Sequence, residues 1–295
     1  MSGLQKLYQV VSGVVGDGAL LTIQPSGNHG DGLIRIGCNK FFYDNDIGTV
    51  PFRPERLRAD NPPPLGVYRP DVYYRILQDY VTYAKHSFSS RISAIYIHGG
   101  ANFNDFWSSG SRCYKTAARF FDVPIIVGPQ SGVFEDTNIV DLFDGVDNPT
   151  YFFCRDEYSY ELLADALSNV SVNLYLEDDT ALYLDAADLP TQKISSEYNL
   201  LALRRDKESR NVLIDEPVSP PIRVGDISID EPDYESFVKA GARARRIYTD
   251  RLHGAILAIL LEKPVTFYEN AYHKNRGVYE YSLSGYDNVD FVYEN

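Results

Sequence analysis

The chain has 295 residues, of which 44% are hydrophobic and 13% aromatic, enough to form the cores of two domains of ordinary size. Its formal net charge of −13 argues against a protein that coats nucleic acid or docks on anionic lipid, because both need a basic surface. The sequence has no window of about 20 apolar residues and does not begin with a signal-peptide pattern, so we expect a cytoplasmic protein without an integral membrane segment.

The cysteines also limit the kind of protein. Cys38, Cys113 and Cys154 are far apart in the chain and lie among apolar neighbours. An odd number of scattered cysteines favours buried, reduced thiols over disulfides or a zinc site. We therefore expect no metal and no other cofactor.

In the first two-thirds of the chain, short apolar runs alternate with turns and helical stretches. This is the pattern of α/β units around a mostly parallel sheet. Strands are predicted at 19–25, 92–100, 123–130 and 150–154, and helices from near Asp31 to 42, at 111–121 and from about 157 to 167.

The last third repeats the alternation. Strands are predicted at 198–206, 246–250 and 264–270, and helices at 233–244 and 251–262, so that 264–270 is the last strand of the chain. The polar segment "DAADLPTQKISSEYN", residues 185–199, has no clear period and is the expected boundary. The order of the elements predicts two Rossmann-like α/β domains, 1–190 and 191–295, that face each other across a cleft.

Four polar clusters follow predicted strands, at the positions where open α/β sheets bind ligands. The first, "SGNHGDG", brings Asn28 and Asp31 to the start of a helix. Its glycines would let the backbone approach a ligand closely, whereas Asp31 would equally serve as the N-cap of that helix.

The second cluster, "HGGANFNDFW", follows a hydrophobic strand. Gly100, Asn102, Asn104 and Asp105 suit either a loop that lines a pocket or an ordinary turn, since Gly and Asn are common turn residues.

The third and fourth clusters contain arginines. Arg155 stands beside Asp156 and Glu157, which fits either a ligand contact or a surface ion pair. In "YTDRLHGAILAILLEKPV", Arg251 and His253 flank a strand-to-helix junction. Free backbone N–H groups and the helix dipole favour an anion at such a junction, so we expect anion binding there.

Together these clusters resemble the polysaccharide pyruvyl transferase family. The resemblance rests on "GNHGDGLI", "HGGANFNDFW", "VGPQSG", "CRDEYSYELL", "LRRDKES", "TDRLHGAILAILLEKPV" and "YHKN", in the family's order over about residues 20 to 280. It implies a fold similar to that of the two-domain GT-B glycosyltransferases. It also implies transfer of the enolpyruvyl unit of phosphoenolpyruvate onto a sugar, free or lipid-linked, with formation of a pyruvate ketal and release of phosphate.

The resemblance assigns provisional roles to the clusters. Arg155 and Arg251, with His253 and the backbone at Leu252, are the expected donor ligands, because phosphoenolpyruvate carries a carboxylate and a phosphate. His253 is either the acid that protonates the donor or a phosphate ligand only.

The acceptor sugar is expected on the N-terminal domain, where Asp31 and Asp105 are possible bases or sugar anchors. The remaining candidates for sugar binding are Asn28, Gly100, Asn102 and Asn104. A GT-B glycosyltransferase that uses a nucleotide sugar, and a non-catalytic glycan-binding protein of the same fold, are the alternatives.

Overall fold

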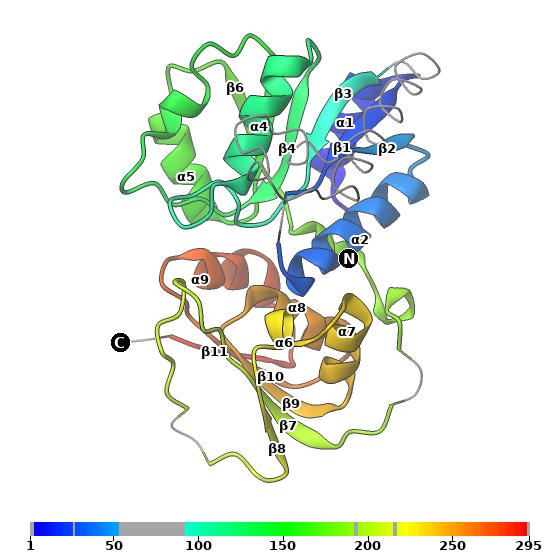
Figure 1. Cartoon of the computed structure of the whole chain (residues 1–295), viewed down its shortest axis with the longest axis vertical. Helices are drawn as coiled ribbons and strands as arrows, with labels where there is room; N and C mark the ends of the chain where they lie inside the picture. The colour runs from blue at the N-terminus through cyan, green and yellow to red at the C-terminus, as the bar shows by residue number, and fades with distance from the viewer. Residues whose placement is uncertain (1–2, 26, 53–91, 192–193, 215–216, 294–295) are drawn as a thin grey trace, which may run out of the picture.

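The structure, a computed structural model, describes residues 3–25, 27–52, 92–191, 194–214 and 217–293. It contains two β-sheets that follow one another along the long axis of the molecule (Figure 1). All strand pairs within both sheets are parallel. The expected α/β class is therefore confirmed.

The first sheet has the strand order β2-β1-β3-β4-β5-β6. Its strands are β1 (Ala19–Ile23), β2 (Thr49–Phe52), β3 (Ile92–Ile97), β4 (Ile125–Gln130), β5 (Thr150–Cys154) and β6 (Val172–Leu176). The accompanying helices are α1 (Gln5–Val15), α2 (His29–Asp44), α4 (Ser109–Phe120) and α5 (Glu157–Ala166), with short 3₁₀ helices at Ile139–Leu142, Thr180–Tyr183 and Ala186–Asp188. The three cysteines are buried thiols, as expected.

The second sheet has the order β11-β10-β9-β7-β8. Its strands are β7 (Tyr198–Ala202), β8 (Ile222–Val224), β9 (Ala244–Thr249), β10 (Val265–Tyr268) and β11 (Val289–Val292). The helices are α6 (Ile227–Asp230), α7 (Tyr234–Ala242), α8 (Leu252–Leu260) and α9 (Lys274–Val278), and a π-helical turn covers Tyr279–Leu283.

Two sequence-based expectations about elements are corrected. The strand at 264–270 is not the last, because β11 follows it and pairs with β10. With only four residues, β11 is too short to show a clear alternation of polar and apolar positions. The helix predicted from near Asp31 begins at His29, and its N-cap is Asn28 rather than Asp31.

Both sheets reverse their strand order at the same relative position. β1 lies between β2 and β3, and β7 lies between β8 and β9, so each sheet has its switch point beside its first strand. Ligands of open α/β sheets bind outside the carboxyl ends of the strands at such a point. A ligand is therefore expected beside the segments that follow β1, β3, β7 and β9.

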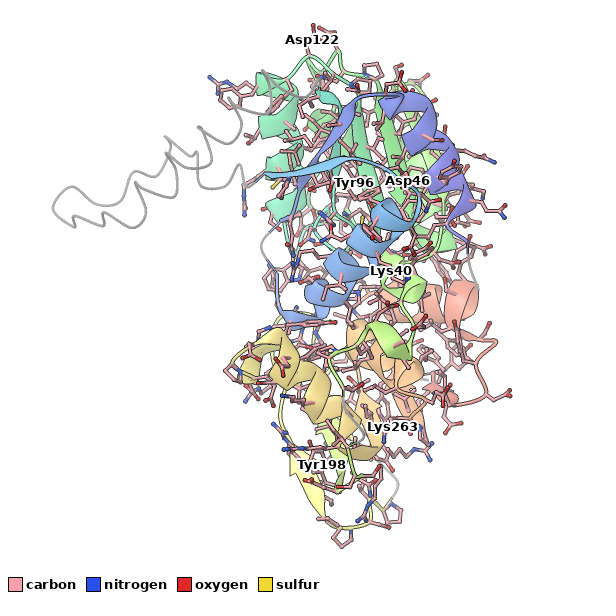
Figure 2. All side chains as sticks on the ribbon, turned by 90° about the vertical axis from the view of Figure 1, so that its right-hand side faces the viewer. Lys40, Asp46, Tyr96, Asp122, Tyr198 and Lys263 are labelled. Carbon is pink, nitrogen blue, oxygen red and sulfur yellow. The ribbon has the colours of Figure 1, made fainter. Side chains whose placement is uncertain are left out.

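Helix α2 packs against both parts of the molecule. Phe41 and Phe42 belong to the core around the first sheet, whereas Leu33 belongs to the core around the second. In Figure 2, Lys40 on α2 lies between Tyr96 of the first sheet and Tyr198 of the second along the long axis. The boundary predicted at 190/191 stays a prediction.

Gly37 allows the close approach of α2 to the chain after β6. A Cβ at this position would lie 2.0 Å from the carbonyl oxygen of Thr180. Gly37→Ala should therefore force the backbones apart and lower the free energy of unfolding by about 1–3 kcal/mol, as overpacking does. Denaturant unfolding measures this change.

The matched control is Gly13→Ala in α1, where a Cβ would meet nothing within 4 Å. There the substitution should raise stability by about 0.5–1 kcal/mol through helix propensity alone. Equal effects at the two positions would contradict the steric explanation.

Candidate functional site

A pocket of about 800 Å³ lies at the carboxyl ends of the strands beside both switch points. Its wall takes residues from the segments after β1, β3, β7 and β9, and from α4, α6 and α9. The lining residues are Gly27, Asn28, His29, Asp31, Ala101, Asn102, Phe106, Trp107, Ser108, Ser109, Arg112, Arg155, Arg204, Asp206, Glu208, Ser228, Ile229, Arg251, Leu252, His253 and Lys274.

Most of the residues selected from the sequence meet in this pocket. The predicted residues that line it are Asn28, Asp31, Asn102, Arg155, Arg251, Leu252 and His253. The other three, Gly100, Asn104 and Asp105, are not among its lining residues. The four clusters therefore come together, but of the residues predicted in the second cluster only Asn102 lines the pocket, beside Ala101, Phe106 and Trp107.

Asn28 and Asp31 begin α2 with a capping box. The side chain of Asn28 accepts a hydrogen bond from the Gly30 N–H at 2.8 Å, and Asp31 Oδ2 accepts one from the Asn28 N–H at 2.8 Å. This arrangement satisfies backbone donors that the first turn of a helix leaves free. Both side chains also border the pocket, so capping holds them at its edge.

Asp105 fastens a neighbouring segment. Its carboxylate accepts hydrogen bonds from the backbone N–H groups of Glu135 and Asp136, at 2.6 and 2.8 Å, and from the hydroxyl of Thr137. Burial raises the pKa of Asp105, but these hydrogen bonds outweigh it and leave the pKa lowered. The carboxylate therefore points to the 135–137 segment.

Asn104 orients the aromatic part of the same loop. Its side chain accepts a hydrogen bond from the Trp107 N–H at 2.6 Å and donates to the Tyr272 hydroxyl at 3.3 Å. Phe106 stacks on Tyr272, with 5.4 Å between ring centroids. The loop after β3 is thus tied to the segment after β10, across the pocket.

Arg155 does not pair with its neighbours Asp156 and Glu157, which was one of the two alternatives for this cluster. Its side chain is buried, donates from Nε to the Ser131 hydroxyl at 2.9 Å, and pairs through Nη1 with Asp179 Oδ2 at 2.5 Å. Asp156 instead caps α5 by accepting from the Ser159 N–H at 2.7 Å.

Arg251 and His253 also contact carboxylates from other parts of the chain. Arg251 forms a two-pronged pair with Asp226 and contacts Asp206 Oδ2 at 2.9 Å. His253 Nε2 lies 3.3 Å from Asp179 Oδ2. Asp226, Asp206 and Asp179 therefore hold the side chains of Arg251 and His253 beside the N-terminus of α8.

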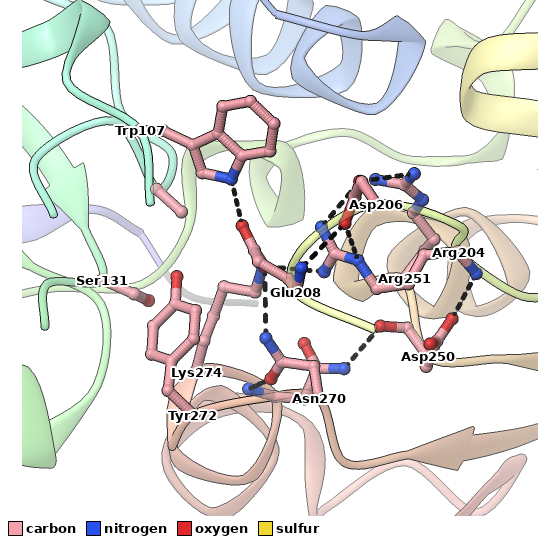
Figure 3. Close-up of polar contacts among 12 residues, drawn as sticks. Trp107, Ser131, Arg204, Asp206, Glu208, Asp250, Arg251, Asn270, Tyr272 and Lys274 are labelled. Atoms are coloured by element: carbon pink, nitrogen blue, oxygen red, sulfur yellow. Dashed lines mark hydrogen bonds and ion pairs between the residues drawn. The ribbon is translucent and has the colours of Figure 1, made fainter. Parts of the chain in front are cut away.

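Sequence reasoning missed a group of residues around Glu208. Figure 3 shows its carboxylate between Trp107 and Lys274. It accepts from Trp107 Nε1 at 2.5 Å, Arg204 Nη1 at 2.6 Å and Asn270 Nδ2 at 3.2 Å, and it pairs with the Lys274 ammonium. The signal for these residues is the charged segment "LRRDKES" directly after a strand, together with "YHKN".

Burial affects both members of the Glu208–Lys274 pair. Desolvation raises the pKa of Glu208, yet the adjacent Lys274 and Arg204 outweigh it and lower the pKa to about 2. Desolvation lowers the pKa of Lys274 to about 8, because Glu208 only partly offsets the loss of water and two arginines repel the ammonium.

The pocket has the opposite charge balance to the whole chain. Its cationic lining residues are Arg112, Arg155, Arg204, Arg251 and Lys274, against the acids Asp31, Asp206 and Glu208. The lining therefore offers guanidinium and ammonium N–H groups to an anionic ligand, although Asp179 and Asp226 behind it pair with Arg155 and Arg251.

The described residues, 3–25, 27–52, 92–191, 194–214 and 217–293, also bear on metal and membrane binding. Within these ranges, no group of three or more His, Cys, Asp and Glu side chains could hold a metal ion. No helix that the structure describes combines the length and the apolar character needed to cross a membrane.

Comparisons with known proteins identify a family. The family model described as polysaccharide pyruvyl transferase matches residues 28–272. A structure of a protein of uncharacterized function from Klebsiella pneumoniae subsp. pneumoniae NTUH-K2044 is 22% identical, covers 100% of both chains and has a TM-score of 0.69, which indicates a shared fold. No curated protein matches the sequence.

Two more distant structural neighbours carry the names of enzymes that act on nucleotide-activated sugars. A UDP-GlcNAc 2-epimerase from Methanocaldococcus jannaschii is 11% identical, with a TM-score of 0.47, over 93% of this chain and 88% of that one. A heptosyltransferase from E. coli is 10% identical, with a TM-score of 0.38, over 94% of this chain and 93% of that one.

The Glu208 cluster leads to a prediction about stability. The folded-state pKa of about 2 lies below the ordinary 4.5, so the ionised carboxylate stabilises the fold fully above about pH 4.5, and this contribution is lost as pH falls toward 2. Glu208→Gln should lower the free energy of unfolding by about 3–5 kcal/mol at pH 7, because buried cations lose their partner. The difference from the parent should shrink in acid.

The control is Glu280→Gln, since Glu280 forms a more exposed pair with Arg276. Its effect should stay within about 1 kcal/mol. Denaturant unfolding over the pH range in which the parent is folded compares the two. A Glu208→Gln effect as small as that of the control would show that the buried pair contributes little.

Proposed function

Because this chain belongs to the polysaccharide pyruvyl transferase family, we propose that it moves the enolpyruvyl unit of phosphoenolpyruvate onto a sugar of a cell-envelope polysaccharide or glycan. Two hydroxyls of the sugar become linked to the former C2 as a pyruvate ketal, and phosphate is released. The acceptor, free or lipid-linked, meets the donor in the cytoplasm. The observation that carries the proposal is the convergence of Arg155, Arg251 and Lys274 with His253 on one pocket.

The donor carries a carboxylate and a phosphate, which need several charge-assisted hydrogen bonds. Within the described part of the chain, no hydrogen bond involves Nη2 of Arg155 or Nη1 of Arg251, although the other nitrogens of both groups are engaged. These two nitrogens are available to a bound anion. We assign Arg251 and the N–H groups of Leu252 and His253 to the phosphate, with Arg155 on the same anion.

The acceptor is assigned to the other wall of the pocket. Asn28, Asp31 and Asn102 line it from the first part of the chain, with the exposed face of Trp107 beside them. In this proposal residues 1–190 form the acceptor domain and 191–295 the donor domain, facing each other across the pocket in a GT-B-like arrangement.

The proposed chemistry needs an acid and a base. His253 protonates the methylene carbon of the donor, which leaves an electron-poor C2, and a sugar hydroxyl attacks that carbon. Asp31 is the better candidate base, because it borders the pocket, whereas Asp105 is engaged by the 135–137 segment. One Asp31 oxygen caps α2, and the other accepts no hydrogen bond among the described residues, so we assign it to a sugar hydroxyl.

Donor specificity separates this proposal from a nucleotide-sugar glycosyltransferase and from a glycan-binding protein without activity. At about 100 times its Kd, phosphoenolpyruvate should stabilise the protein by about 2.7 kcal/mol and raise its Tm. Phosphate should then be released from phosphoenolpyruvate with at least one member of a panel of galactosides, mannosides and glucuronides. Stabilisation by a nucleotide sugar alone, or by sugars alone, would refute the proposal.

Arg251 gives the sharpest test of the donor site. A charge-assisted hydrogen bond is worth about 1.5–3 kcal/mol, so Arg251→Ala should weaken phosphoenolpyruvate binding by about 10- to 150-fold in a calorimetric titration. Arg251→Lys should restore only part of the affinity, because an ammonium cannot reproduce the two-pronged guanidinium contact.

A matched control is Arg205→Ala, one residue away from the lining residue Arg204. The side chain of Arg205 is 65% exposed, and Arg205 is not among the pocket-lining residues. This variant should bind the donor as the parent does. If Arg251→Ala folds and binds equally well, Arg251 is only a structural partner of Asp226.

A further inference from the structure

Asp179 is a buried carboxylate that joins two of the proposed donor-site residues. It follows β6 and is the N-cap of the 3₁₀ helix Thr180–Tyr183, where its Oδ1 accepts from the Ala181 N–H at 2.8 Å. Its Oδ2 accepts from Arg155 at 2.5 Å and lies 3.3 Å from His253 Nε2. Its side chain is 1% exposed. Both oxygens are therefore occupied by protein groups.

In the contact between His253 and Asp179, only the histidine can donate the hydrogen bond. Burial raises the pKa of Asp179, but Arg155 and then His253 outweigh it and hold the pKa well below the usual range. The carboxylate is therefore ionised and can only accept a hydrogen bond. The proton in the contact must belong to Nε2 of the imidazole. A neutral imidazole has a single N–H, so its Nδ1 then carries the lone pair.

The other ring nitrogen lies near the first turn of α2. A Cβ at Gly30 would lie 2.8 Å from His253 Cβ and 3.2 Å from His253 Nδ1. This turn carries Asn28 and Asp31, which border the pocket. His253 lines the pocket, whereas Asp179, which faces Nε2, is buried and does not, so Nδ1 is the ring nitrogen that remains for a ligand.

We infer that Asp179 is a positioning residue that keeps a proton on Nε2 of His253, so that proton transfer to the donor takes place through Nδ1. The inference rests on the proposed function. In the transfer step the Nδ1–H bond breaks and its electron pair stays on Nδ1, while the π electrons of the donor double bond form the new C–H bond. Before this step both ring nitrogens of His253 carry a proton, and the Asp179 carboxylate beside Nε2 stabilises this imidazolium.

Asp179 differs in this respect from Asp226, the acid that pairs with Arg251. Both oxygens of Asp226 accept from Arg251, and among the described residues neither oxygen forms a hydrogen bond with a histidine. Asp179 instead shares one oxygen between a guanidinium and an imidazole. The same carboxylate therefore sets the position of a donor ligand and the tautomer of the proposed acid.

The tautomer can be measured without activity. In the full chain labelled with ¹⁵N-histidine, NMR at a pH where His253 is neutral should show its proton on Nε2 and an unprotonated Nδ1. His253→Gln identifies the signal by its loss. A neutral His253 with the proton on Nδ1 would overturn the inference, whether or not the protein turns over phosphoenolpyruvate.

The second test is Asp179→Asn, which retains an acceptor for the Ala181 N–H but removes the charge. We expect kcat to fall by about 10²–10⁴-fold, the range of general acid–base catalysis, and KM for phosphoenolpyruvate to rise as well, because Arg155 loses its carboxylate partner. The matched control is Asp185→Asn, because Asp185 caps the next 3₁₀ helix through the Ala187 N–H at 2.8 Å and is exposed. Its kcat should equal that of the parent.

These outcomes separate the two proposals. A folded Asp179→Asn protein with the parent's kcat would refute the positioning role even though the proposed function held. If the parent releases no phosphate from phosphoenolpyruvate with any sugar, the proposed function fails, and the NMR measurement still decides the tautomer. The NMR measurement on the parent also decides it if Asp179→Asn does not fold.

Discussion

Burial of positive charge is the constraint on which the pocket depends. Arg155, Arg204 and Arg251 are only 1–6% exposed, and an isolated buried cation would cost several kcal/mol. Each therefore contacts at least one carboxylate: Asp179 after β6 pairs with Arg155, Asp226 after β8 pairs with Arg251, and Glu208 pairs with Arg204 within the segment after β7. The acids hold the guanidinium groups in fixed directions, so a ligand would meet cations that are already oriented, without the entropy loss of ordering long side chains.

The acidic character of the whole chain is compatible with this arrangement. Most of its negative charge lies outside the pocket, whose lining has more cations than acids. A net charge of −13 keeps such a protein in solution, but it repels an anionic ligand at long range. Salt screens this repulsion beyond roughly 8–10 Å, whereas the contacts inside the pocket are much shorter and partly shielded from water.

The sequence predicted where the charged side chains of the pocket lie in the chain, but it did not predict which residues they contact. The predicted strand-to-helix junction after Thr249 indicated Arg251 and His253 as site candidates, because the ends of strands and helices follow from local sequence patterns. Asp179 and Asp226 were missed because they reach their arginines from 24 and 25 residues away, and no local pattern reports such a contact. Asp105 looked like a site residue from its glycine-rich context, but its orientation depends on the 135–137 segment.

The shared acids also link the two walls of the pocket. Glu208, which follows β7, accepts from Trp107 of the loop after β3 and from Lys274 of α9. Trp107 donates to Oε1, whereas Lys274, Arg204 and Asn270 donate to Oε2. One buried carboxylate therefore fixes the loop after β3 relative to the segments after β7 and β10, and the position of Trp107 at the pocket depends on it.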